Sequence, residues 1–557
     1  MVVPAIVLLL IAALIPLSHA LVPTWQFVHR GDDAFYYFQV ALNYAELGEW
    51  SFDKIHRTNG VQPLWAALLS AAAQILSGLG IEDKAQLARI FVGLTALANV
   101  GGAFVLFHIV RRSISTGTAL AAAGAFLVPL GIVWQRSWGM ENSLYALLLL
   151  STVGYYHLKF LPRPGAGAAL LLGGLLGLVV LARLNAGIFV PILLAHFLFF
   201  TRVQPPSTRF WLAVLAGLAA TAVVLPYLLY NLGTTDHLLP VSAAAKKVYA
   251  QYLTSTRSPA TPLEVSFWQE NGWRNLRHLT WFGTSRMLDG MWILGSRIVF
   301  GGNSAAPVEY FFAILGALIV LPALLRGRSV GWFSFLWARL RLLGAFWYVL
   351  VFGVANFTIS IVLYPHQLGY AITRWWWVEI EVILSVSAAT LSVAVLAYVA
   401  QGLPARIMRG NVIATALVAL LILYQGVSHI SHYWFQERRV YDWNRSGNDA
   451  WFDAAQWLSA NVESTAVVGA WNAGVLAYYS DQRVVNLDGL INNFDYLEYM
   501  RDGRIEDYVE KTGITYIADM ESMFEIFDLP ARLKFEPVYE EFSQFYGMHF
   551  MIYKVVR

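Results

Sequence analysis

The sequence predicts a polytopic α-helical membrane protein with a C-terminal α/β domain, and three observations lead to this prediction. First, 58% of the 557 residues are hydrophobic and only 13% are charged, which is more apolar than soluble globular domains are. Second, apolar runs of the roughly 20 residues that cross a bilayer recur as far as residue 429. Third, polar residues return from Ser431 onward, where short β-like runs alternate with amphipathic ones.

The composition also excludes several classes of protein. The 38 Lys and Arg against 35 Asp and Glu give a net charge of +3, too small and too scattered to indicate a nucleic-acid partner. Cysteine is absent, which excludes disulfides, iron–sulfur clusters and thiolate zinc sites. Any metal ion would therefore bind to Asp, Glu, His or carbonyl oxygen.

The apolar runs define a transmembrane domain over residues 1–429. We expect about eleven spans, near 1–21, 88–110, 115–134, 143–160, 166–183, 186–201, 210–230, 308–325, 343–363, 377–400 and 411–429. The first run ends in a possible signal-peptide cleavage site, but we favour a retained helix. The apolar segment 61–80 contains Gln and Pro, so we expect a helix lying at the outer membrane surface there.

Basic residues fall in alternate connections between these spans, which the positive-inside rule places in the cytoplasm. The other connections then face outward, namely the first outer loop 22–87, 135–142, the long outer loop 231–307, 364–376 and everything after 430. We therefore predict a multi-pass protein of the cell membrane whose C-terminal domain, 430–557, is extracytoplasmic.

The C-terminal domain is predicted to contain four strands and several helices. Its expected elements are helix 449–460, strand 466–471, helix 473–479, strand 483–487, helices around 493–510, strand 514–518 and strand 548–555. No strand is followed by a glycine fingerprint for a dinucleotide, so no nucleotide cofactor is expected.

Two adjacent carboxylates, Asp32 and Asp33, stand out in the first outer loop. In one interpretation Asp32 caps the helix from Asp33 to about Leu47, and Asp33 favours the positive end of that helix. In the other, an ionised Asp removes a proton from an acceptor hydroxyl, or the pair binds a divalent cation such as Mg²⁺ or Mn²⁺. The sequence leaves both open.

Further polar residues are candidates for substrate binding at the same face of the membrane. Arg57, Asn59 and Gln62 supply hydrogen-bond donors for a sugar or a phosphate, although each is also an ordinary loop residue. Glu141 opens a span on the outer side, where it either touches substrate or favours the helix N-terminus. Arg183, at the outer end of a span, is sufficiently explained by snorkelling.

Basic residues in the two later outer loops are candidates for a phosphate site. Lys246 and Lys247 would neutralise the phosphate of a lipid carrier or, equally, contact anionic lipid headgroups. His366 and Arg374 are weaker candidates for the same role. The histidines near the cytoplasmic span ends show no metal-ligand spacing.

Several segments resemble GT-C superfamily glycosyltransferases, with a layout similar to the protein O-mannosyltransferase and arabinofuranosyltransferase types. The strongest is GDDAFYYFQVALNYAELGEWSF with TNGVQPLWAALL, which looks like their first extracytoplasmic loop. Shorter matches are Gly139–Asn142, Leu181–Asn185, Leu239–Ser242 followed by Lys246, Gly469–Gly474 and Val485–Gly489. The resemblance implies an acidic first-loop residue as catalytic base, by position Asp32 or Asp33, and the family's Asp-Glu pairs favour Asp32.

The resemblance and the outer acidic loop together predict a glycosyltransferase. It would move one sugar, a hexose or pentose, from a polyprenyl-phosphate donor to an extracytoplasmic glycan, lipid or protein, with inversion at the anomeric carbon. A membrane transporter or flippase is the main alternative, but the acids cluster at one face and no inverted repeat is visible. A non-catalytic lipid-binding subunit is the second alternative.

Overall fold

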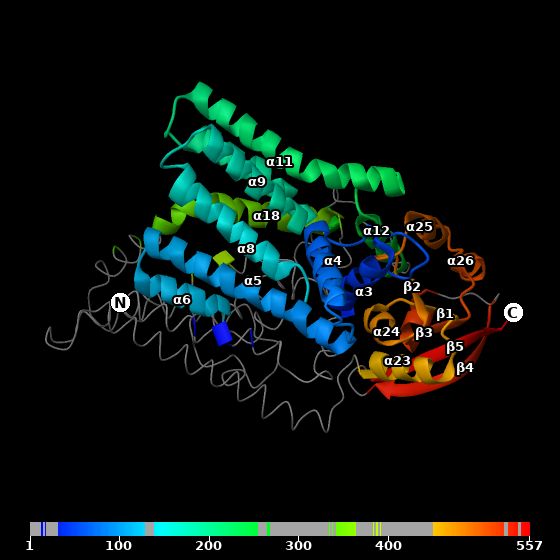
Figure 1. Cartoon of the computed structure of the whole chain (residues 1–557). Helices are drawn as coiled ribbons and strands as arrows, with labels where there is room; N and C mark the ends of the chain where they lie inside the picture. The colour runs from blue at the N-terminus through cyan, green and yellow to red at the C-terminus, as the bar shows by residue number, and fades with distance from the viewer. Residues whose placement is uncertain are drawn as a thin grey trace.

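The computed structural model describes residues 32–127, 139–253, 265–267, 341–363, 449–527, 533–543 and 547–556, together with several isolated positions. In these ranges a bundle of helices lies beside a smaller α/β domain, and the helices α3, α4 and α12 lie between the two (Figure 1). The predicted spans 1–21, 308–325, 377–400 and 411–429 fall wholly or almost wholly outside the described residues, so the count of eleven stays a prediction.

Helices occur at every predicted span that the structure describes. They are α5 (Lys84–Ser113), α6 (Thr116–Leu127), α8 (Asn142–Tyr155) continued by the π-helical turn η2 (Tyr156–Phe160), α9 (Ala166–Ala182), η3 (Leu184–Ile188) with α10 (Phe189–Ala195) and η4 (His196–Phe200), α11 (Pro206–Thr235), and η6 (Arg341–Phe346) with α18 (Trp347–Leu363). By length and composition, α5 and α11 are able to cross a membrane, with mean hydropathies of 2.0 and 2.2.

Two helices from the first outer loop support the site. They are α3 (Asp32–Leu47) and α4 (Pro63–Gly78). A third helix beside them, α12 (Val241–Leu253), belongs to the long outer loop 231–307. Pro63 begins α4, a position where the missing N–H costs nothing. The structure confirms a helix within 61–80, and its place at the membrane surface stays a prediction.

The C-terminal domain is built on a five-stranded mixed sheet of order β2-β1-β3-β5-β4. Its strands are β1 (Val467–Ala470), β2 (Arg483–Asn486), β3 (Tyr516–Met520), β4 (Lys534–Ser543) and β5 (Met548–Val556). β1 runs parallel to β2 and β3, whereas β5 runs antiparallel to β3 and β4. The helices are α23 (Asp449–Asn461), α24 (Gly474–Tyr479), α25 (Phe494–Arg501), α26 (Ile505–Thr512) and α27 (Glu521–Ile526).

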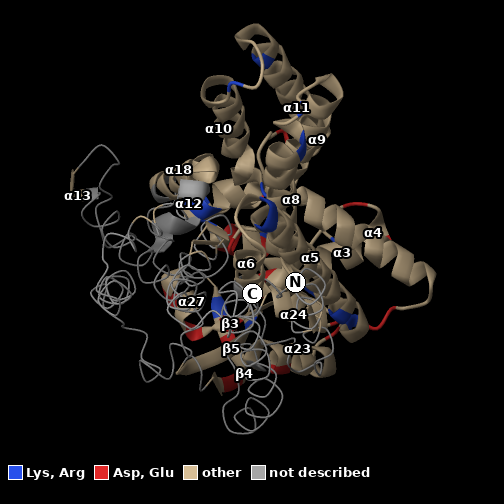
Figure 2. Cartoon of the chain, turned by 90° about the vertical axis from the view of Figure 1, so that its left-hand side faces the viewer, with Lys and Arg blue, Asp and Glu red and all other residues tan. Residues whose placement is uncertain are grey.

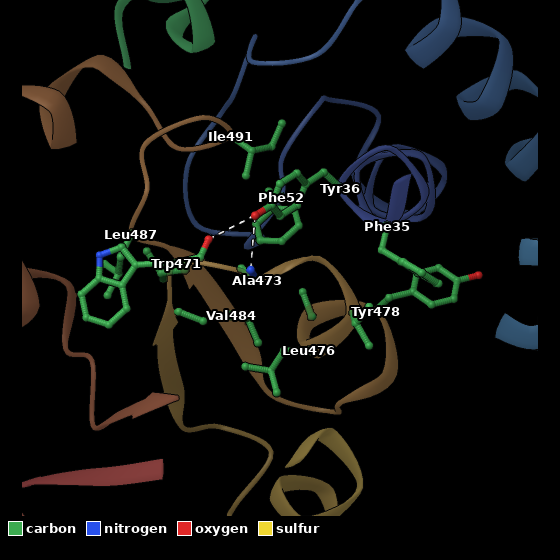
Figure 3. Close-up of a cluster of buried hydrophobic side chains, with 14 of the residues drawn as sticks. Phe35, Tyr36, Phe52, Trp471, Ala473, Leu476, Tyr478, Val484, Leu487 and Ile491 are labelled. Atoms are coloured by element: carbon green, nitrogen blue, oxygen red, sulfur yellow. Dashed lines mark hydrogen bonds between the residues drawn. The ribbon is translucent and has the colours of Figure 1, made fainter. Parts of the chain in front are cut away.

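One hydrophobic core joins the first outer loop to the C-terminal domain. Phe35 of α3 packs against Tyr478 of α24 with ring centroids 5.4 Å apart, and both side chains are buried. Figure 3 shows this contact next to Tyr36, whose hydroxyl lies near the end of β1. The two parts of the chain thus meet across a packed apolar interface to which both contribute buried residues, and the site lies beside it.

Candidate functional site

A cavity of about 350 Å³ lies where the bundle, the first outer loop and the C-terminal domain meet. Its size falls in the usual range of small-molecule pockets, roughly 300–1,000 Å³. The polar and charged side chains of its wall come from six segments: Asp33, Tyr36 and Tyr37 of α3, Gln62 before α4, Glu141 before α8, Arg183 and Asn185 after α9, Ser242 and Lys246 of α12, and Asn356 and Ser360 of α18. Few charged residues lie along α9, α10 and α11 (Figure 2). The charged side chains that line the cavity are therefore unusual within the bundle.

The two adjacent aspartates face different partners. Asp33 lines the cavity, whereas the carboxylate of Asp32 accepts hydrogen bonds from the backbone N–H groups of Gly474 (3.0 Å) and Val475 (2.7 Å). Both aspartates lie in the first turn of α3, where acidic side chains favour the positive end of a helix. The carboxylate that reaches the cavity is Asp33, although the resemblance favoured Asp32 as base.

Burial and neighbouring charges set the protonation of Asp33. Burial, Asp32 and Glu141 raise its pKa and Lys246 lowers it, and the net result is a rise from the ordinary 3.8 to about 6. Burial, reinforced by nearby Arg183, lowers the pKa of Lys246 from 10.5 to about 8. Near neutral pH the cavity therefore holds an ionised Asp33 next to a Lys246 that is largely protonated.

Glu141 lines the cavity and is held by hydrogen bonds to its neighbours. The Tyr37 hydroxyl donates to Glu141 Oε2 (3.1 Å) and accepts from the backbone N–H of Gln62 (3.2 Å). The side-chain oxygen of Gln62 accepts from the N–H of Leu184 (3.0 Å). These bonds link α3 to Gln62, to Glu141 before α8 and to the turn after α9. Glu141 and Gln62 therefore lie beside the acidic pair, and their role in substrate binding stays a prediction.

Arg183 is a site residue that sequence reasoning missed. Its side chain is buried, with 6% exposed, and it lines the cavity, so the snorkelling interpretation is wrong. One Nη donates to Asn142 Oδ1 (3.2 Å), and Nε lies 4.0 Å from Glu141 Oε1. Snorkelling would place the guanidinium in water at the membrane surface. The available signal was the Leu-Ala-Arg-Leu-Asn motif in which Arg183 stands.

Neutral polar residues of the cavity wall were also missed. The Asn185 amide donates to Asn356 Oδ1 (3.0 Å), and Ser360 lies one helical turn after Asn356 on α18. Asn356 and Ser360 are buried in a helix whose one other polar residue with a hydrogen-bonding side chain, apart from Tyr348 and Trp347 at its start, is the exposed Thr358. Two buried polar residues spaced four apart in such a span were the signal in the sequence.

The remaining predicted residues lie elsewhere. Lys247 is exposed and outside the cavity wall. Arg57 is exposed and pairs with Glu49 (2.5 Å), whereas buried Asn59 accepts from the N–H of Val241 (2.8 Å) and so fixes the start of α12. His366 and Arg374 fall outside the described residues.

The donors around Asp32 and Asp33 do not fit a metal ion held by this pair. Both oxygens of Asp32 accept backbone N–H groups, and the cation that acts on Asp33 is Lys246. Within the described ranges, no group of three or more His, Asp and Glu side chains is arranged to bind a metal. The Mg²⁺ or Mn²⁺ that the sequence analysis allows for Asp32 and Asp33 stays a prediction, and no chemical step below depends on a metal.

Comparison with known proteins places the fold. Residues 435–554 match a domain of unknown function, DUF8728, and a search of curated protein sequences finds no match. The archaeal oligosaccharyltransferase AglB from Archaeoglobus fulgidus, solved with an inhibitory peptide and a dolichol-phosphate, is similar over 98% of this chain and 74% of its own, at 15% identity and a TM-score of 0.54. ArnT from Cupriavidus metallidurans in the apo state is similar over 99% of this chain and 97% of its own, at 12% identity and a TM-score of 0.51. The chain thus shares the fold of these two proteins, a bundle of helices followed by a C-terminal domain, as the resemblance to the GT-C type predicted.

Proposed function

We propose that this chain is a membrane glycosyltransferase that moves one sugar from a polyprenyl-phosphate donor to an extracytoplasmic acceptor. The observation that carries the proposal is one cavity that brings together a carboxylate, Asp33, and two cationic side chains, Lys246 and Arg183. A fold shared with AglB, which was solved with a dolichol-phosphate, supports a lipid-phosphate donor.

Lys246 and Arg183 bind the phosphate of the donor. Each cation lies near a carboxylate, Asp33 for Lys246 and Glu141 for Arg183, so these four side chains are close to charge-balanced. A phosphate brings further negative charge, which raises the pKa of Lys246 and favours its ammonium form. As the bond to the sugar breaks, the two cations stabilise the charge that develops on the leaving phosphate.

Asp33 acts as the general base. Its ionised carboxylate accepts the proton of the acceptor hydroxyl while the hydroxyl oxygen attacks the anomeric carbon. The bond from that carbon to the phosphate oxygen breaks at the same time, through a transition state with oxocarbenium character. One displacement from the face opposite the phosphate inverts the anomeric configuration. The proton ends on Asp33 and the electron pair on the phosphate.

The size and the neutral wall of the cavity favour a single sugar. Its volume of about 350 Å³ lies near the lower end of the range for small-molecule pockets, roughly 300–1,000 Å³. The amides of Asn185 and Asn356 and the hydroxyl of Ser360 offer both donors and acceptors to sugar hydroxyls. The acceptor, a glycan, lipid or protein of the cell envelope, approaches from the outer side.

A panel of radiolabelled polyprenyl-phosphate sugars tests the proposal with purified protein in lipid vesicles. The wild type should transfer one labelled sugar, and Lys246→Met should weaken use of that donor by about 1.5–3 kcal/mol, the range for a charge-assisted hydrogen bond. Lys247→Met is the matched control, because Lys247 is exposed one residue away. Equal donor use by Lys246→Met, Arg183→Gln and the Lys247→Met control would remove the phosphate site from the proposal.

A further inference from the structure

The two adjacent aspartates, Asp32 and Asp33, have different surroundings and therefore different roles. We propose that Asp32 is a positioning residue that fastens the C-terminal domain to α3 and thereby fixes Asp33 in the cavity. This inference rests on the proposed function, because it takes Asp33 as the base. It gives the C-terminal domain a direct part in the reaction.

The carboxylate of Asp32 holds the C-terminal domain through two charge-assisted hydrogen bonds. Oδ2 accepts from the N–H of Gly474 at 3.0 Å, and Oδ1 accepts from the N–H of Val475 at 2.7 Å. Hydrogen bonds with one ionised partner are shorter and stronger than neutral ones. Each oxygen thus has its own donor, and the carboxylate has one defined orientation.

A second contact lies one turn further along α3. The Tyr36 hydroxyl donates to the carbonyl oxygen of Trp471 (3.1 Å) and accepts from the N–H of Ala473 (3.3 Å), as Figure 3 shows. Residues four apart share one face of a helix, so Asp32 and Tyr36 contact the same short segment, residues 471–475. Two points of attachment fix both the position and the rotation of the first turn of α3.

That segment is itself held rigidly by the sheet. Asp519 of β3 accepts from the N–H groups of Trp471 (2.9 Å) and Asn472 (2.7 Å), and its other oxygen accepts from the Asn472 side chain (3.1 Å). The segment therefore has acidic side chains on both sides, Asp519 from its own domain and Asp32 from α3. Movement of α3 relative to the sheet would break one set of bonds.

The contact also leaves no space for adjustment. A Cβ atom at Gly474 would lie 2.2 Å from the backbone oxygen of Asp32, so only glycine permits this approach. Successive residues of a helix point about 100° apart, which directs Asp33 away from the domain and into the cavity when Asp32 faces it. The orientation of the base thus follows from the docking of its neighbour.

The first experiment replaces Asp32 by Asn, which retains only one acceptor oxygen for the two N–H groups. We expect kcat to fall by about tenfold to a hundredfold with the donor KM nearly unchanged, since small misplacements of reacting groups cost that much. Hydrogen exchange at the amides of Gly474 and Val475 should become faster. Asp83→Asn is the matched control, because Asp83 accepts from a backbone N–H at the start of α5 (Gln86, 2.8 Å) without touching the cavity.

The second experiment keeps both carboxylates and disturbs the contact from the other side. Gly474→Ala places a methyl group against the Asp32 backbone, and it should reduce kcat in the same manner as Asp32→Asn. Gly174→Ala, in α9, adds the same methyl group where no atom lies within 4 Å, and it should leave kcat unchanged. Purified, folded protein is compared at equal amounts, so that a loss of expression does not count as a loss of rate.

The outcomes separate this inference from the proposed function. Normal kcat and unchanged amide exchange in Asp32→Asn, together with an inactive Asp33→Asn, would overturn the positioning role and leave the base in place. An active Asp33→Asn would overturn the proposed base. Amide exchange at Gly474 and Val475 in Asp32→Asn would then still show whether Asp32 holds the C-terminal domain against α3. Slow turnover of Asp32→Asn and Gly474→Ala with fast exchange at residues 474 and 475 supports the inference.

Discussion

Asp33 has neighbours of both charge signs, and they act on its pKa in opposite directions. Burial, Asp32 and Glu141 raise the pKa, Lys246 lowers it, and the balance is about 6. A general base works best when its pKa is near the working pH but low enough for it to be ionised. The neighbours of Asp33 therefore determine the pH at which the proposed reaction begins.

The pH dependence of kcat/KM should report this balance. The wild-type rate should rise as the pH passes through about 6, where Asp33 ionises. Lys246→Met removes a cation that favours the ionised form, so the midpoint should move to higher pH. Glu141→Gln removes a like charge and should move the midpoint to lower pH. Lys247→Met should leave the midpoint unchanged, and a profile that none of these variants shifts would argue against Asp33 as the titrating group.

Asp488 predicts a pH dependence of stability. Burial, with Asp33 and Asp32 nearby, raises its pKa from 3.8 to about 8. The folded protein therefore keeps this proton over a pH range in which the unfolded chain has lost it, and stability should fall as the pH rises from about 4 to about 8. Asp488→Asn should flatten the fall in apparent melting temperature between about pH 5 and pH 9. An equally steep fall in this variant would show that other groups cause it.

Individual site residues could be predicted only where neighbouring residues in the sequence showed a polar loop or the end of a membrane span. Asp33, Glu141, Gln62 and Lys246 stand in polar outer loops or at span ends, and all four line the cavity. Arg183 was misread because a basic residue at a span end has an ordinary explanation in lipid. Which of Asp32 and Asp33 faces the cavity depends on contacts with residues more than 400 positions away, and no local pattern encodes them.

At the scale of elements, the sequence indicated most helices and strands because their hydrophobic periods are clear. The unpredicted β4 combines Pro537 with several charged residues, and its side chains are largely exposed. Such a strand lacks the alternation of a half-buried one, because it lies at the sheet edge and pairs only with β5. Its place in the sheet is set by β5, which is strongly apolar.

The close packing of α9 against α11 depends on glycines of α9, and substitution of these glycines tests it. A Cβ at Gly173 would lie 2.2 Å from the carbonyl oxygen of Ala216, and a Cβ at Gly177 would lie 2.6 Å from Val223 Cβ. Small residues four apart allow such close approach of two membrane helices. Gly173→Ala should therefore destabilise the protein by about 1–3 kcal/mol, as measured by thermal unfolding in detergent.

Gly174→Ala is the control for this change. It lies one residue along the same helix, and its Cβ would meet no atom within 4 Å. Alanine is the better helix former by roughly 0.5–1 kcal/mol, so this variant should be as stable as the wild type or slightly more so. Equal melting temperatures for both variants would contradict the close contact of α9 with α11.

The proposed function requires the first outer loop and the C-terminal domain to lie on the same side of the membrane. The shared hydrophobic core and the contacts of Asp32 and Tyr36 join the two. Sequence reasoning reached the same arrangement from the alternation of basic connections. It gave no sign that the two parts share one core, because such contacts join residues distant in the chain.

Cysteine labelling tests this topology without background, since the chain has no cysteine. Glu82→Cys and Glu510→Cys, both at exposed positions, should react with a membrane-impermeant thiol reagent in intact cells. Ser207→Cys, exposed on the opposite end of the bundle at the start of α11, should react only after the membrane is opened. Labelling of Ser207→Cys in intact cells would place the site on the wrong side for an extracytoplasmic acceptor.

The proposed function depends most directly on Asp33, which removes the proton of the acceptor hydroxyl during sugar transfer. Asn has the size of Asp but no basicity, and a general base contributes about 10²–10⁴-fold to a rate. The decisive measurement is the rate of single-sugar transfer by Asp33→Asn under saturating polyprenyl-phosphate donor, compared with an equal amount of folded wild type. We expect donor binding to be retained and transfer to slow by at least about a hundredfold. A transfer rate within a factor of a few of the wild type would contradict the claim.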